Sequence, residues 1–358
     1  MSDTKDFEGT RPVADAHRFD AAALERYLRE RIPGFAGPID IVQFKGGQSN
    51  PTFRLDAGGR RYVLRRKPPG TLLPSAHAVD REFRVMSALA GTDVPVTRCH
   101  VLCTDEAVIG SMFYVMDYVP GRILWDPLLP GLERGERTAL FDEMNRVIAA
   151  LHSVDAADVG LADYGKAGNY FARQIARWSR QYKASETEAI PAMDRLIEWL
   201  PQNIPPGDET AIVHGDFRMD NLIFHPTEPR VLAVLDWELS TLGHPMADFS
   251  YHMMAWRLAG DEFRGLRGSD LGTLGIPTEE AYLDRYLQRR GIAARPDARA
   301  WSFYLAYNLF RLAAILQGVM ARALAGNAAS AQAQDAGRRA RPLAERGWAE
   351  VEQMRAAE

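Results

Sequence analysis

The sequence predicts an α+β protein with two lobes, a small one built on an antiparallel sheet and a larger, mainly helical one. Three observations predict this class. Short β-branched or aliphatic runs separated by turn residues occupy residues 39–66. Apolar residues at helical spacing dominate from Arg134 onward. The chain has 358 residues, more than one ordinary domain needs, so two compact parts are expected.

The first lobe begins after a short amphipathic helix over residues 22–31, which ends at Pro33 and Gly34. Alternating and β-branched residues then predict three strands, at 39–44, 52–56 and 61–66. Turns are expected over 45–50 and at Gly58 and Gly59. The three strands should form an antiparallel sheet.

One helix and two more strands should complete this lobe. Apolar residues near helical spacing predict a helix from Ser75 to Ala90, with Ser75 as its cap. Residues 107–109 and 113–118 read as strands, and Pro120-Gly121 ends the second. The predicted organisation is an N-terminal extension and helix (1–34), an N-lobe (35–115), a hinge (116–120) and a C-lobe (121–358).

The second lobe is predicted to be helical around one pair of strands. Residues 134–154 carry an apolar stripe typical of a core helix. After a turn-rich segment, residues 210–213 and 230–235 form short aliphatic runs, each followed by polar residues. Two such strands would bring a carboxylate from each, Asp216 and Asp236, to one edge.

These polar residues have the pattern of a phosphotransferase site. Phosphoryl transfer needs a carboxylate beside the attacking hydroxyl and oxygen ligands that hold magnesium across the phosphates of ATP. Asp216 follows His214 and Gly215, and Asn221 comes five residues later, which is the spacing of a kinase catalytic loop. We therefore expect Asp216 to be catalytic, and Asn221 and Asp236 to bind Mg²⁺.

Each fragment alone has an ordinary structural explanation. His-Gly-Asp is a common turn, and an Asp after an apolar strand is often a helix cap. The joint pattern of the His-Gly-Asp turn, Asn221 at its fixed spacing and the Asp-Trp-Glu that starts at Asp236 favours a kinase site.

With these motifs the sequence resembles the aminoglycoside phosphotransferase and choline kinase group, which shares the bilobal fold of the eukaryotic protein kinases. His-Gly-Asp stands where protein kinases have His-Arg-Asp. The segments 47–53, 63–77 and 235–245 are similar to the kinase domains joined to acyl-CoA dehydrogenase family members ten and eleven. The resemblance covers about residues 35 to 325.

The resemblance implies a nucleotide side in the N-lobe. The phosphate-covering loop would use Gly46, Gly47, Ser49 and Asn50, although Gly-Gly alone usually marks a hairpin turn. Arg65 stands where the family has a phosphate-anchoring Lys, with Lys67 as the alternative anchor and Glu82 as its partner. The remaining implied residues are Met116 and Tyr118 for adenine, with His214 and Asp248 supporting the catalytic loop.

The acceptor is expected in the C-lobe. Candidates for its binding are Arg218, Asp220, Tyr251, His252, Trp256, Tyr307, Asn308 and Arg311. The last three lie at helical spacing, so packing explains them equally well. The resemblance implies transfer of the ATP γ-phosphate to a small-molecule hydroxyl, with a 4-hydroxyacyl-CoA, a CoA thioester, as the leading acceptor. The alternatives are an aminoglycoside or choline-type kinase, and a nucleotide-binding module without catalysis.

Composition excludes other classes. A net charge of −4 gives no overall attraction to nucleic acid or to an anionic membrane. Residues 1–18 lack an apolar signal core, which favours a cytoplasmic protein. The apolar segment 301–319 is interrupted by polar residues and is expected to be a buried helix. Cys99 and Cys103 lack zinc-site spacing and are expected to be reduced.

Overall fold

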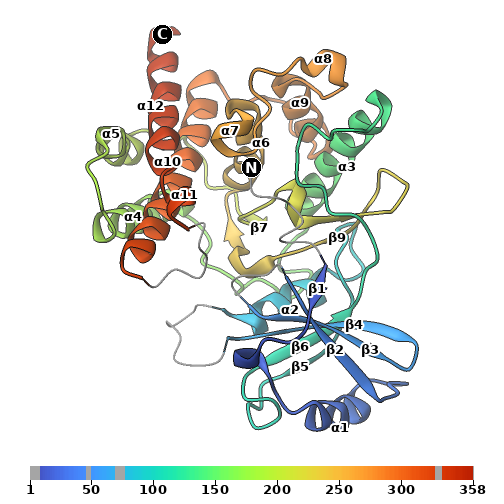
Figure 1. Ribbon diagram of the computed structural model, residues 1–358. Helices are drawn as coiled ribbons and strands as arrows, with labels where there is room; N and C mark the ends of the chain where they lie inside the picture. The colour runs from blue at the N-terminus through green and yellow to red at the C-terminus, as the bar shows by residue number, and fades with distance from the viewer. Residues whose placement is uncertain (1–8, 46–49, 69–76, 327–332, 358) are drawn as a thin grey trace. The chain divides into compact units, whose positions relative to one another are not determined.

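The computed structural model describes residues 9–45, 50–68, 77–326 and 333–357. The chain packs into two compact units (Figure 1). Unit 1 comprises Met1–Trp125 and Asp220–Ser240, and unit 2 comprises Asp126–Met219 and Thr241–Glu358.

Unit 1 is built on an antiparallel sheet that has six strands among the described residues, in the order β1-β2-β3-β4-β6-β5. The elements before its second segment are β1 (Thr10–Arg11), η2 (Asp15–His17), α1 (Ala21–Arg31), β2 (Ile39–Phe44), β3 (Thr52–Ala57), β4 (Arg60–Arg66), α2 (Val79–Leu89), β5 (Cys99–Cys103) and β6 (Phe113–Asp117). The second segment adds η4 (Met219–Asn221), which starts at the last residue of unit 2, β8 (Leu222–Phe224), β9 (Val231–Val234) and η5 (Trp237–Leu239).

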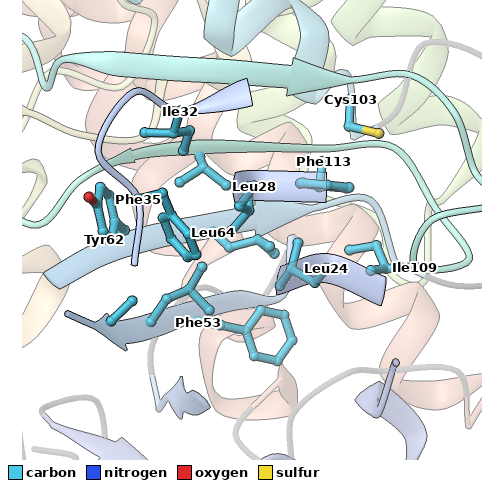
Figure 2. Close-up of a cluster of buried hydrophobic side chains, with 13 residues drawn as sticks. Leu24, Leu28, Ile32, Phe35, Phe53, Tyr62, Leu64, Cys103, Ile109 and Phe113 are labelled. Atoms are coloured by element: carbon cyan, nitrogen blue, oxygen red, sulfur yellow. The ribbon is translucent and has the colours of Figure 1, made fainter. Parts of the chain in front are cut away.

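The two faces of this sheet have different chemistry. Figure 2 shows the apolar face, where Leu24 and Leu28 of α1 pack with Leu64 of β4 and Phe113 of β6. Because neighbouring strand residues point to opposite faces, Arg65 projects to the other side of the sheet, where Glu82 of α2 contacts it. The apolar face supplies one core cluster of unit 1, and the opposite face carries Arg65 and packs against α2.

A hairpin ties residues 220–240 into unit 1. β8 pairs with β9, and Arg122 exchanges backbone hydrogen bonds of 2.9 Å with Phe224. The chain approaches so closely that a Cβ on Gly121 would lie 2.4 Å from both Ile223 Cγ2 and Phe224 O. Only glycine fits at this position without moving the hairpin.

Unit 2 is mainly helical. Its elements are α3 (Arg134–Ser153), α4 (Tyr170–Ala184), α5 (Pro191–Trp199), η3 (Leu200–Gln202), β7 (Ala211–Val213), β10 (Thr241–Gly243), α6 (Pro245–Arg257), α7 (Gly260–Phe263), α8 (Leu271–Leu274), α9 (Glu279–Arg289), α10 (Ala298–Leu324), α11 (Ala333–Gly337) and α12 (Ala340–Ala357). Helix α10 packs against α4, α6 and α12. By length and composition α10 could cross a membrane, but 83% of its most apolar window is buried inside the protein. That burial is typical of a core helix.

The predicted α+β class is confirmed, and most predicted elements are present. Two element boundaries were predicted wrongly. Residues 107–109 form a turn, and the edge strand that pairs with β6 on the side away from β4 is Cys99–Cys103. The second helix begins at Val79 with Ala78 at its N-cap, so it does not extend back to Ser75, which lies outside the described residues.

The two strands that were expected to deliver Asp216 and Asp236 to one edge do not form a pair with each other. β7, which precedes Asp216, pairs with β10, whereas β9, which precedes Asp236, pairs with β8. The two strands belong to different two-stranded sheets. Aliphatic runs predict strands, but run composition does not identify the pairing partner.

Candidate active site

In unit 2, the loop after β7 is held by Asp248 of α6. The backbone N–H groups of His214 and Gly215 donate to Asp248 Oδ2 and Oδ1, at 2.7 and 2.8 Å. Gly215 has φ of +83°, a conformation that glycine adopts without strain. The buried carboxylate of Asp248 therefore fixes the loop backbone. The sequence had indicated Asp248 for this supporting position.

Two histidines complete this support. His152 of α3 lies 3.1 Å from Asp248 Oδ2 through Nε2, and 2.7 Å from Tyr286 Oη through Nδ1. Burial by itself raises the pKa of Asp248, but hydrogen bonds from His152 and from the His214 backbone outweigh burial and lower it. His214 accepts a 3.2 Å hydrogen bond from the Asp216 N–H at Nδ1. His152 thus contacts the supporting carboxylate, and His214 contacts the loop backbone itself.

Asp216 follows this fixed loop. Tyr251 of α6 donates a 2.6 Å hydrogen bond to Asp216 Oδ1, and Arg218 Nε lies 3.0 Å from the same oxygen. Burial, and then the charge of Asp216, raise the pKa of Tyr251 far above its usual value, so its hydroxyl remains a donor. A carboxylate oriented in this way can accept a proton from a bound hydroxyl.

Arg311 of α10 supports the same loop. Its Nη2 donates to Gly215 O at 2.7 Å, and its guanidinium lies 5.1 Å from the Tyr251 ring centroid and 5.9 Å from that of Trp178. A guanidinium can stack on aromatic rings while it donates hydrogen bonds in its own plane. The sequence indicated Arg311 as a residue that binds the phosphoryl acceptor. In the structure it contacts the backbone beside Asp216.

In unit 1, the β8–β9 hairpin brings the two predicted metal ligands together. The register pairs Leu222 with Val234, and Leu235 N donates to Asn221 O at 2.8 Å. Asn221 and Asp236 therefore lie at the same end of the hairpin. Asp236, two residues after the end of β9, has φ of +63° and ψ of +58°, a conformation uncommon for a residue other than glycine.

Arg65 joins Asp236 to helix α2. Its Nε lies 2.9 Å from Glu82 Oε2, and its Nη2 lies 2.8 Å from Asp236 Oδ1. Burial by itself lowers the pKa of Arg65, but the carboxylates of Glu82 and Asp236 outweigh it and raise the pKa. Lys67, the alternative anchor, is half-buried just beyond β4 and makes no ion pair among the described residues. Arg65 is thus the cation that contacts Glu82.

Three of the predicted phosphate-loop residues, Gly46, Gly47 and Ser49, lie outside the described residues. Asn50 is fully buried, and its amide donates to Glu82 Oε1 at 2.9 Å. The sequence assigned this amide to the nucleotide, and the structure pairs it with a carboxylate of α2.

The segment predicted to contact adenine forms backbone pairs with other strands of unit 1. Met116 pairs with Val63 of β4 and Cys99 of β5. The Tyr118 N–H donates to Arg61 O at 3.3 Å, and the Arg61 guanidinium lies 4.7 Å from the Tyr118 ring centroid. The Tyr118 amide therefore already has an acceptor, and its contact with adenine stays a prediction.

The other acceptor candidates separate by position. Asn308 is fully buried and donates to Ala247 O and Ser250 Oγ, so it joins α10 to α6. Tyr307 is also buried, and its ring packs edge-on against Phe171. Asp220 belongs to unit 1, in η4. Arg218 contacts the Asp216 carboxylate.

Sequence reasoning placed Tyr251 in the acceptor site without identifying it as the partner of Asp216, and it missed Tyr114 as a partner of Glu82. Tyr251 comes three residues after Asp248 on α6, so both side chains lie on one helix face. That spacing could have identified it. Tyr114 is a buried strand residue, and its contact depends on a sheet pairing that the sequence did not specify.

Comparison with known proteins identifies the family. Residues 40–304 match the model of the "Phosphotransferase enzyme family". The chain belongs to this family. Such phosphotransferases include kinases that act on hydroxyl groups of small molecules, and this activity class agrees with the groups around Asp216.

Curated relatives share nearly the whole chain. Acyl-CoA dehydrogenase family member 10 of Mus musculus is 50% identical over 342 residues, which cover 95% of this phosphotransferase and 32% of the relative. Acyl-CoA dehydrogenase family member 11 of Gallus gallus is 46% identical, over 95% of this chain and 44% of the relative. The chain thus spans less than half the length of these two relatives.

Solved structures agree on the fold. A Ralstonia eutropha JMP134 protein, provisionally described as an aminoglycoside phosphotransferase, is 59% identical, with a TM-score of 0.87 over 94% of this chain and 99% of that one. Choline kinase of Cryptosporidium parvum is 12% identical, with a TM-score of 0.65 over 94% of this chain and 97% of that one. The protein-kinase-like fold expected from the sequence is confirmed.

Proposed function

We propose that this phosphotransferase transfers the γ-phosphate of ATP to the hydroxyl of a hydroxyacyl-CoA, most simply a 4-hydroxyacyl-CoA, in a Mg²⁺-dependent reaction in the cytoplasm. The observation that carries the kinase chemistry is the fixed loop of unit 2. There Asp248 holds the backbone, and Tyr251 and Arg218 orient the Asp216 carboxylate. Asp216 then accepts the proton of the acceptor hydroxyl as that oxygen attacks the γ-phosphorus, whose bond to the β–γ bridging oxygen breaks and releases ADP.

The hairpin of unit 1 has the donor chemistry that magnesium prefers. Asn221 offers an amide oxygen and Asp236 a carboxylate, and the β8–β9 register places both residues at one end. Magnesium in kinases uses few protein ligands because phosphate oxygens and waters complete its shell. Bound there, the ion would neutralise phosphate charge. Arg65, fixed by Glu82, would bind phosphate with its remaining N–H groups.

The choice of an acyl-CoA acceptor rests on two supports. The relatives are named as acyl-CoA dehydrogenases, and a kinase joined to such a protein would act on the same class of metabolite. Arg218 and Arg311 also bring positive charge to the loop beside Asp216. Positive charge suits an acceptor with carboxylate or phosphate groups more than a polycationic aminoglycoside. A functional link to an acyl-CoA dehydrogenase is part of the proposal.

The test is a panel of acceptors. Purified protein is incubated with ATP and Mg²⁺ and with 4-hydroxyacyl-CoAs, the free hydroxy acids, choline or aminoglycosides, and the product that gains phosphate is identified by mass. We expect phosphate on a hydroxyacyl-CoA, and loss of nearly all transfer in Asp216→Asn. Phosphate on an aminoglycoside or choline alone would reject the acceptor, and full activity of Asp216→Asn would reject the role of Asp216.

A further inference from the structure

Glu82 is held by more groups than its pairing with Arg65 requires. The side chain is almost completely buried on α2. Its Oε1 accepts from Asn50 Nδ2 at 2.9 Å, and its Oε2 accepts from Tyr114 Oη at 3.0 Å and lies 2.9 Å from Arg65 Nε. Asn50 precedes β3, Tyr114 is on β6 and Arg65 is on β4, so three separate segments of unit 1 converge on one carboxylate.

The orientation of the Asn50 amide follows from its partners. An ionised carboxylate only accepts hydrogen bonds, so the NH₂ group of Asn50 must face Glu82. The amide oxygen then faces His77, whose Nδ1 lies 3.1 Å away. Each end of the amide is engaged, and the side chain has no exposed surface through which its second N–H could reach a nucleotide in this arrangement.

Tyr114 is the second hydrogen-bond donor to Glu82, and its hydroxyl stays protonated. Burial, and then the charge of Glu82, raise the pKa of its hydroxyl well above the usual value, so it stays protonated. Its ring is fully buried next to Phe83 of α2, with 6.2 Å between ring centroids. The hydroxyl therefore has little freedom to leave Glu82.

We propose that Asn50 and Tyr114 are positioning residues, which hold Glu82 in the orientation that directs Arg65 toward Asp236 and the nucleotide phosphates. The inference rests on the proposed nucleotide site. A glutamate has three side-chain torsions, and a buried carboxylate that loses a donor rotates or takes up a proton. Either change weakens the fixation of Arg65, whose Nη2 otherwise contacts Asp236. Asn50 thus contributes to the site through Glu82 of α2.

The experiment measures binding of Mg·AMP-PNP by calorimetry, which needs no acceptor. Asn50→Ala and Tyr114→Phe are compared with the wild type and with Tyr62→Phe. Tyr62 is a buried tyrosine of the same sheet whose ring packs against Phe35 and His100. A hydrogen bond to a charged group is typically worth about 10-fold or more in an equilibrium constant. We expect each of the first two variants to weaken binding about 10-fold, and Tyr62→Phe to leave it unchanged.

The decisive arm repeats both substitutions in a Glu82→Gln background. If Asn50 and Tyr114 act through Glu82, each should then change the dissociation constant by less than about 2-fold, because the carboxylate they hold is gone. An undiminished loss in that background would mean direct contact with the nucleotide and would overturn the proposal. Unchanged binding in the wild-type background would overturn it as well.

Two further outcomes separate this inference from the proposed function. A wild-type protein that binds Mg·AMP-PNP but phosphorylates no acceptor rejects the proposed reaction, while the binding comparison still decides the role of Asn50. A wild-type protein that binds no nucleotide overturns both. If Asn50→Ala does not fold, Tyr114→Phe keeps the ring volume and carries the test alone in both backgrounds.

Discussion

The Tyr251 hydroxyl donates a 2.6 Å hydrogen bond to Asp216 Oδ1, and both residues belong to the same compact unit. The donor is on α6, the helix that also carries Asp248. One helix therefore fixes the backbone of the loop through a carboxylate and orients the Asp216 side chain through a phenol.

Replacing Tyr251 with Phe removes this donor and keeps the ring over which Arg311 lies. We expect kcat to fall about 10-fold or more, since hydrogen bonds to charged groups are worth about 1.5–3 kcal/mol. The KM for ATP should stay unchanged, because Asn221 and Asp236 are intact. Steady-state kinetics would measure both, with Tyr304→Phe, a ring stacked on Phe171, as the control. Equal losses in the two variants would contradict the prediction.

Arg65→Lys tests the value of a guanidinium at this position. Arg65 uses two different nitrogens, one near Glu82 and one near Asp236. A lysine ammonium concentrates its donors on one atom and cannot keep both geometries. We expect a KM for MgATP about 5-fold to 10-fold higher, by loss of roughly one hydrogen bond, and little change in Lys67→Ala. A normal KM in Arg65→Lys together with a raised KM in Lys67→Ala would transfer the anchoring role to Lys67.

Asp248→Asn should destabilise the protein as well as reduce its activity. The substitution replaces one acceptor oxygen with an NH₂ group that faces a backbone N–H of His214 or Gly215. Breaking such a buried network costs about 3–5 kcal/mol. Urea unfolding would show the loss of free energy, and Asp194→Asn, at an exposed ion pair with Lys183, should change it little. A small change for Asp248→Asn would mean that the loop is held by other contacts.

Acidification should destabilise the folded state through two buried histidines of unit 2. Burial lowers the pKa of both His244 and His252 to about 4, below the ordinary 6.5. Between these values the unfolded chain binds more protons, so the free energy of unfolding falls as pH falls from about 6.5 toward 4. Each histidine contributes a slope of about 1.4 kcal/mol per pH unit within that window. Denaturant titrations at pH 6.5, 5.8 and 5.0 would measure the free energy of unfolding. A free energy that does not change over this range would contradict the burial of both rings.

The sequence predicted those parts of the site that depend on short spacing. The interval from Asp216 to Asn221, the Arg65–Glu82 contact and the support of the loop by Asp248 are local patterns, or pairs expected from the family resemblance. Their chemical roles stay predictions. Helix and strand positions were also predictable, because hydrophobic periodicity records which face is buried.

Pairing between distant segments was not predictable. The aliphatic runs before Asp216 and Asp236 look alike, yet they join different sheets, because pairing depends on which partner strand satisfies the backbone. The strand at Cys99–Cys103 was missed for a related reason. Its burial pattern is mostly intermediate, so no clear alternation marks it. The use of Asn50 by Glu82 likewise needs the tertiary fold.

Gly121 and the hairpin it contacts have a consequence for dissecting the chain. Unit 1 is assembled from two stretches of sequence, and the second, Asp220–Ser240, is flanked on both sides by residues of unit 2. A fragment that stops at Trp125 would lack Asp236 and would expose the surface that Arg122 and Gly121 present to β8. No single cut yields either unit whole. Recombination between related genes would therefore have to exchange both stretches together to move unit 1 as a whole.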